Sequence, residues 1–100
     1  MLDKLQSSDF LPNLNTIFRI HLDGEADAVP LELARVTGTG QRFSPEAREA
    51  FSLLFLGPVS PHHLVQHIYR LELEEMGTLE IFLVPLGPEN GRMKYEAIFN

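Results

Sequence analysis

The sequence predicts one all-β domain, residues 1–100, in which about six antiparallel strands form a small barrel, half-open barrel or sandwich. Three observations lead to this fold class. Short segments alternate apolar and polar residues with a period of two, glycine and proline turns separate these segments, and no long window has the period of a helix. A chain of 100 residues has room for one modest hydrophobic core and therefore for one domain.

The first two predicted strands show this alternation most simply. In residues 16–22 the apolar side chains of Phe18 and Ile20 share one face, which is typical of a half-buried strand. Residues 29–37 start with the same pattern and then change phase. One extra residue in a strand produces such a change, so we predict a β-bulge near Ala34.

A third strand is predicted over residues 51–56, which carry hydrophobic residues on both faces, and one or two short helical turns are predicted elsewhere. Residues 44–50 begin with serine and proline, the signature of a helix start, and allow at most one or two helical turns. Near the N-terminus, Ser7 or Ser8 can cap a short turn that runs through Leu11. We expect the apolar residues around Phe10 to dock there as a plug over one end of the sheet.

The last third of the chain predicts a three-stranded meander. Its strands are residues 68–74, 79–86 and 93–99, and each contains an apolar alternation or an apolar run. The dipeptide Asn90-Gly91 lies before the last strand and supplies the positive φ angles that a tight hairpin turn needs.

Four segments place apolar strand residues next to turn glycines and prolines: Phe51–Phe55 with Gly57-Pro58, Tyr69–Glu72, Leu79–Pro85 with Gly87-Pro88, and Tyr95–Asn100. Together with Asp9-Phe10 they resemble a small uncharacterised bacterial domain family of unknown function. Some members of that family are encoded near proteins with phage-tail-collar-like domains. The resemblance therefore implies assembly with a tail-like or fibre-like partner, and it implies no activity and no catalytic residue.

The charge and composition exclude several classes of function. The formal net charge is −6, and basic residues form no cluster, so we expect neither nucleic acid nor a membrane surface as a partner. The chain has no cysteine and therefore no disulfide or thiolate chemistry. No apolar run approaches the ~20 residues that span a bilayer. The start of the chain lacks the pattern of a secretory signal, so we expect a cytoplasmic location.

Three histidines form the one cluster with the appearance of a metal site: His62, His63 and His67. Neutral imidazoles bind zinc, copper or nickel, and a spacing of four residues can align two of them on a helix. The segment departs from the resembled family, in which a tighter turn with a glycine near His67 is expected, and it runs from a proline into a strand. We therefore favour structural or solvated histidines and predict no metal and no cofactor; a metal-dependent enzyme is the weakest of the alternatives.

Other reactive residue types have simpler interpretations. Four acidic residues lie on or beside the hairpin that joins residues 68–74 to 79–86: Glu72, Glu74, Glu75 and Glu80. Glu72 and Glu74 alternate with leucines, which is typical of a solvent-facing strand surface. Ser52 lies in an apolar strand without the sharp turn that exposes a catalytic serine, and Ser44 has the position of a helix cap. We therefore predict that the chain is not an enzyme.

The leading functional hypothesis is an interaction or assembly module. Two strands carry a second apolar face, which needs a cover from within the chain or from a partner. An edge strand near Leu31 offers a further docking site by strand addition. We therefore expect another protein, or a second copy of the chain, to bind through residues chosen from Leu54, Leu56, Phe82, Val84 and Leu31.

The alternative hypothesis is a barrel that binds a small apolar ligand. Aromatic side chains of four different predicted strands can meet at the mouth or interior of such a barrel: Phe18, Phe55, Tyr69 and Tyr95.

Overall fold

The structure is a computed structural model, and it describes residues 5–21, 29–38, 50–58, 65–73 and 76–99. It begins with a short helix and a 3-10 turn, followed by strands. The elements are α1 (Ser7–Phe10), η2 (Leu11–Asn13), β1 (Ile17–Ile20), β2 (Val29–Gly38), β3 (Phe51–Pro58), β4 (His67–Leu73), β5 (Gly77–Glu89) and β6 (Arg92–Phe99). The helical turn predicted over residues 44–50 falls on residues 44–49, which lie outside the described residues, and on Ala50, which precedes β3.

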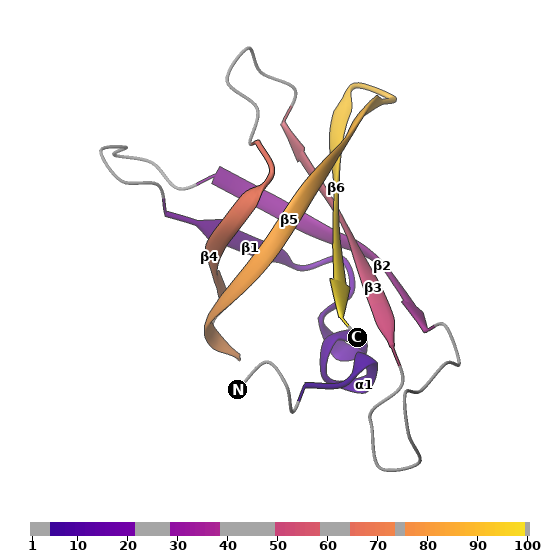
Figure 1. Cartoon of the computed structure of the whole chain (residues 1–100), viewed down its shortest axis with the longest axis vertical. Coiled ribbons are helices and arrows are strands. Elements are labelled where there is room, and N and C mark those ends of the chain that lie inside the picture. The colour runs from indigo at the N-terminus through magenta and orange to yellow at the C-terminus, as the bar shows by residue number, and fades with distance from the viewer. Residues whose placement is uncertain (1–4, 22–28, 39–49, 59–64, 74–75, 100) are drawn as a thin grey trace.

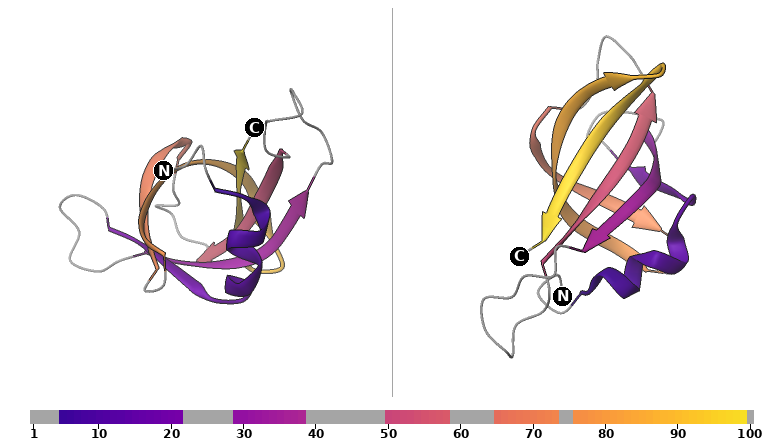
Figure 2. Two further views of the ribbon diagram at one scale, coloured as in Figure 1. Left: turned by 90° about the horizontal axis from the view of Figure 1, so that it is seen from below. Right: turned by 90° about the vertical axis from the view of Figure 1, so that its right-hand side faces the viewer.

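The six strands form a closed antiparallel barrel in the order β1-β2-β3-β6-β5-β4 (Figure 1). Two meanders, β1-β2-β3 and β4-β5-β6, are joined through the β3·β6 and β1·β4 pairings. The view in the left panel of Figure 2 shows the strands as a ring, with α1 at its end. The predicted all-β class, the antiparallel strands and the C-terminal meander are confirmed, and the barrel among the predicted alternatives is the one that forms.

The barrel closes between its first and fourth strands through a short ladder. Arg19 pairs with Glu72, and Ile20 pairs with Leu71. The Nε2 atom of His21 also lies 3.2 Å from the Oε1 atom of Glu72, just past the end of β1. Closure matters because a closed barrel has its strands paired on both sides and so reduces the unpaired backbone that an open sheet exposes.

Two irregularities bend the barrel wall. The register of β2 against β3 shifts between Leu33 and Arg35, which confirms the bulge predicted near Ala34. A second shift lies between Pro85 and Gly87 of β5, where proline has no N–H to donate to the ladder.

The turn between β5 and β6 has the geometry that its sequence predicts. Asn90 has φ 54° and Gly91 has φ 78°, and the flanking residues Glu89 and Arg92 are paired. Positive φ at both central residues is the mark of a two-residue hairpin loop that matches the twist of the strands.

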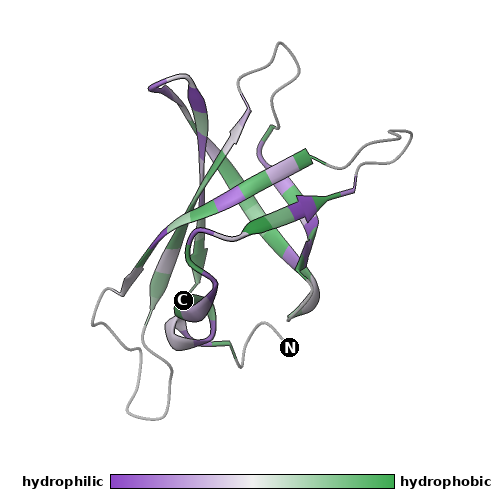
Figure 3. Cartoon of the chain, turned by 180° about the vertical axis from the view of Figure 1, so that it is seen from behind, coloured by the Kyte–Doolittle hydropathy of each residue, from purple (hydrophilic) through white to green (hydrophobic). Residues whose placement is uncertain are grey.

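Alternate residues of every strand point into the barrel, and Figure 3 shows the resulting change between hydrophobic and hydrophilic residues along the strands. The interior is a continuous core in which most inward side chains have no more than a few per cent of their surface exposed. Gly57 also points inward. A Cβ atom at Gly57 would lie 2.6 Å from Cδ2 of Leu31, so a methyl group there would require the Leu31 side chain to shift.

The N-terminal helix plugs one end of the barrel (Figure 2). Phe10 is fully buried, and its ring centroid lies 5.9 Å from that of Phe51 and 5.8 Å from that of Phe99. Phe51 and Phe99 stack with their centroids 4.7 Å apart. The plug predicted around Phe10 is therefore confirmed. It fills the end of the interior, while the outer face of the strands carries the surface described next.

The expected helix cap is wrong. Ser7 is already the first residue of α1, and the capping residue is Gln6, whose backbone N–H donates a hydrogen bond to the Asp9 carboxylate at 2.7 Å. A carboxylate in the first helical turn also interacts favourably with the free N–H groups there.

Candidate interaction surface

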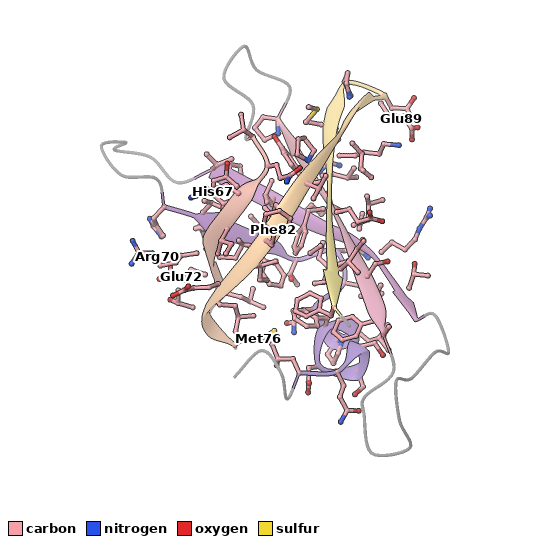
Figure 4. All side chains as sticks on the ribbon, viewed as in Figure 1. His67, Arg70, Glu72, Met76, Phe82 and Glu89 are labelled. Atoms are coloured by element: carbon pink, nitrogen blue, oxygen red, sulfur yellow. The ribbon has the colours of Figure 1, made fainter. Side chains whose placement is uncertain are left out.

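Four large apolar side chains lie on the outer face of β4, β5 and β6, and we call them the outer patch: Ile68, Phe82, Val84 and Ile98. Ile68 pairs directly with Phe82 across the β4·β5 ladder. The exposed fractions are 56% for Ile68, 48% for Phe82 and 64% for Ile98. Figure 4 shows Phe82 in the middle of this wall, on β5. Single exposed apolar residues are ordinary, but a cross-strand group of large ones is typical of a binding surface.

The backbone beside Phe82 also has an unusual arrangement. The ladder between β5 and β6 runs from Val84, paired with Glu96, to Glu89, paired with Arg92. Among the described residues, the part of β5 before Val84 pairs only with β4, and Figure 1 shows β5 and β6 diverging there. Phe82 and Ile98 therefore flank a stretch of wall where the two strands are not joined by a ladder.

Charged side chains lie on opposite sides of the outer patch. In the strand ladders, Arg70 of β4 lies opposite Glu80 of β5. Glu96 of β6 lies opposite Val84 of β5 on one side and Leu54 of β3 on the other. In the described part of the chain, neither Arg70 nor Glu96 takes part in an ion pair. The neighbouring Lys94 differs, since its Nζ atom lies 3.1 Å from Oε2 of Glu89.

Further around the barrel, the outer apolar residues of β3 are better covered. Leu54 and Leu56 are half-buried on the outer face. Glu32 pairs with Leu56, and its Oε1 atom accepts a hydrogen bond from Nη2 of Arg92 at 2.7 Å. Since Arg92 belongs to β6 and Glu32 to β2, this ion pair spans β3 and lies beside Leu56.

The structure places the proposed interaction residues in two environments. Leu54, Leu56, Phe82 and Val84 all lie on the outer face of the barrel. Leu31 points inward and is 0% exposed. The expected docking edge near Leu31 is wrong, because β2 pairs with β1 on one side and with β3 on the other.

The four aromatic residues of the ligand hypothesis lie inside the barrel: Phe18, Phe55, Tyr69 and Tyr95. Phe18 and Phe55 are 0% exposed and meet edge to face, with ring centroids 5.3 Å apart. Tyr69 donates a hydrogen bond from its hydroxyl to the carbonyl oxygen of Val65 at 2.7 Å. Burial raises the pKa of the Tyr69 phenol above its ordinary value.

This burial predicts a pH dependence of stability. Because the folded state holds the Tyr69 proton to higher pH than the unfolded chain does, the free energy of unfolding falls as the pH rises above the ordinary tyrosine pKa of about 10. We expect Tyr69→Phe to remove this part of the alkaline decline. It should cost about 1 kcal/mol at neutral pH through the lost hydrogen bond. Urea unfolding of the wild type and of Tyr69→Phe, from neutral to strongly alkaline pH, measures how steeply each free energy of unfolding falls with pH. The same steepness in both proteins would refute the assignment of this part of the decline to Tyr69.

The residues suggested as metal ligands or catalytic groups do not gather in the described structure. His67 begins β4, and its ring meets that of Tyr69 edge to face with centroids 5.3 Å apart. His62, His63, Ser44, Glu74 and Glu75 lie outside the described residues. Within the described ranges, no three histidine or carboxylate side chains are placed to hold a metal ion.

Glu72 and Glu80 lie on the outer surface, as a solvent-facing alternation predicts, and Ser52 is half-buried on the outer face of β3. In the same described part of the chain, no helix has the length and apolar composition needed to cross a membrane.

The sequence interpretation missed Ile68 and Ile98 as surface residues. The signal was present in the phase of the alternation. Tyr69 and Leu71 point inward, so Ile68 must point outward, and Tyr95 and Ala97 impose the same orientation on Ile98.

The fold and the surface define a class of protein: a small closed antiparallel barrel, plugged at one end by a helix, with an exposed apolar group on one wall. The chain belongs to the family described as Domain of unknown function (DUF6916), which it matches over residues 5–99. Searches of curated proteins and of solved structures found no match.

Proposed function

We propose that this chain is a non-enzymatic protein–protein interaction or assembly module that binds its partner through the outer patch. The observation that carries the proposal is the directly paired, half-exposed combination of Ile68 and Phe82 on the barrel wall. Burying a side chain of this size contributes roughly 1.5–3 kcal/mol. Large aromatic side chains near the centre of a patch are also frequent anchors of interfaces.

The surroundings of the patch support the same function. In the described residues β5 has no ladder with β6 beside Phe82, and the proposed binding mode includes strand addition at this edge of β5 as well as docking of a face. The sequence resemblance to a family encoded near phage-tail-collar-like proteins supports a phage-tail-like or surface-fibre system as the setting. The proposal includes the cytoplasmic location that the sequence leads us to expect.

The test compares Phe82→Asp with Ile17→Asp. Ile17 is 40% exposed and lies on β1, two strands away from β5 in the barrel, so both variants place a carboxylate on an exposed apolar position. The tagged chain is isolated from its native cells after mild cross-linking, and the bound proteins are identified by mass spectrometry. We expect Phe82→Asp to lose the bound protein and Ile17→Asp to keep it, with similar urea midpoints for both. Equal binding by both variants would contradict the proposal.

A further inference from the structure

We propose that the partner at the outer patch is a second copy of this chain, related to the first by a two-fold axis that passes over Phe82. This inference rests on the proposed function and deepens it by naming the partner. It depends on the placement of two charged residues, Arg70 and Glu96, around the apolar centre.

The two charges lie at equal and opposite positions from Phe82. Arg70 lies on β4, the neighbouring strand on one side of Phe82, opposite Glu80. Its position is therefore displaced from Phe82 by two residues toward the start of β5. Glu96 is opposite Val84, so it lies one strand to the other side and two residues forward. One strand corresponds to about 4.8 Å and two residues to about 6.8 Å. Arg70 and Glu96 therefore occupy opposite register positions on the sheet, with Phe82 midway between them.

This arrangement makes the patch complementary to itself. A two-fold axis in the plane of the interface, perpendicular to the line from Arg70 to Glu96, lays Arg70 against the partner's Glu96 and Glu96 against the partner's Arg70. The same axis brings Phe82 against the partner's Phe82, and Ile68 between the apolar side chains of the other copy. An isologous interface needs one patch that carries both halves of each contact, and the outer patch with these two charges does so.

In the described part of the chain, neither Arg70 nor Glu96 forms an ion pair, and the carboxylate nearest to Arg70 in the ladder is that of Glu80, directly opposite it on β5. Two cross-interface ion pairs also oppose the mutual repulsion of two chains that each carry a net charge of −6. A patch of one sign of charge would instead indicate a foreign partner of the opposite sign.

The test uses charge reversal in two separate variants, Arg70→Glu and Glu96→Arg. Each variant alone puts like charges opposite each other twice in the proposed dimer. A mixture of the two restores both attractive contacts, because in the mixed dimer the two reversed side chains face each other and the two unchanged side chains do the same. The matched control is Arg35→Glu, which makes the same change in net charge as Arg70→Glu but on β2, the strand opposite β5 in the barrel.

The measurement is absolute mass by light scattering across a dilution series, with a urea midpoint for each variant. We expect a dimer for the wild type and for Arg35→Glu, and a dissociation constant raised about tenfold or more for each reversal variant alone. An equal mixture of the reversal variants should recover the wild-type dimer. If a reversal variant unfolds, Phe82→Asp serves in its place and should be a monomer.

Three results would overturn the inference: a wild-type monomer at every concentration, equal weakening by Arg35→Glu and Arg70→Glu, or no recovery in the mixture. A monomeric wild type leaves the proposed function standing, because the cross-linking comparison of Phe82→Asp with Ile17→Asp detects a partner of any sequence. The two failures are therefore distinguishable.

Discussion

Phe10→Ala is expected to lower the free energy of unfolding by about 3–5 kcal/mol, the range for removing a buried phenylalanine ring. Phe10 is 0% exposed and fills the end of the barrel between Phe51 and Phe99. Removing its ring leaves a cavity and separates the helical plug from the core that holds it. A small domain has only about 5–15 kcal/mol of stability in total, so a loss of this size brings it close to unfolding.

The measurement is urea unfolding followed by circular dichroism. The matched control is Leu11→Ala, which removes an apolar side chain that is 48% exposed from the next residue of the plug. We expect the control to change the free energy of unfolding by at most about 0.5 kcal/mol. A loss for Phe10→Ala no larger than that of Leu11→Ala would show that the helix does not close the barrel.

Phe18→Ala is expected to have an effect of similar size, again about 3–5 kcal/mol. Phe18 is 0% exposed on β1 and packs edge to face against Phe55 across the interior. The prediction separates a packed interior from a ligand pocket. In a packed interior the loss of the ring is fully destabilising, whereas in a pocket the ring is already partly free of protein contacts.

Its control is Ile17→Ala on the same strand, where the side chain is 40% exposed and points outward. We expect that variant to stay within about 0.5 kcal/mol of the wild type. A small loss for Phe18→Ala, together with a bound molecule in a native mass spectrum of the freshly purified wild type, would support the apolar-ligand hypothesis instead.

The strands were predictable because one rule applies along their whole length. In a barrel wall one face is buried, so the period-two alternation that begins at Phe18 and Ile20 maps directly onto the interior. The bulge near Ala34 was visible for the same reason, since an extra residue shifts the phase of the alternation. The Asn90-Gly91 turn followed from the positive φ angles that only such residues adopt readily.

Other features depend on contacts between distant segments and were not predictable. Nothing local in the sequence distinguishes a closed barrel from an open sheet, so Leu31 was placed near an edge that the β1·β2 and β2·β3 pairings remove. The close approach of Leu31 to Gly57 depends on the packing of a neighbouring strand. The divergence of β5 and β6 beside Phe82 is likewise a property of the assembled wall.

The candidate surface was predicted in part. Phe82 and Val84 were identified because their strand is apolar on both faces, and they do lie on the outer wall. Ile68 and Ile98 were missed because each is a single apolar residue within a clean alternation. Their association with Phe82 comes from strand pairing and placement, which a single sequence does not specify.

The most direct test of the central claim, that the wall around Phe82 binds protein, is photo-cross-linking in living cells with benzoylphenylalanine incorporated at position 82 or, as a control, at position 17. The account predicts a covalent protein adduct from position 82 and little or none from position 17, and the mass of the adduct identifies the partner. No adduct from position 82, or equal adducts from both positions, would contradict the account.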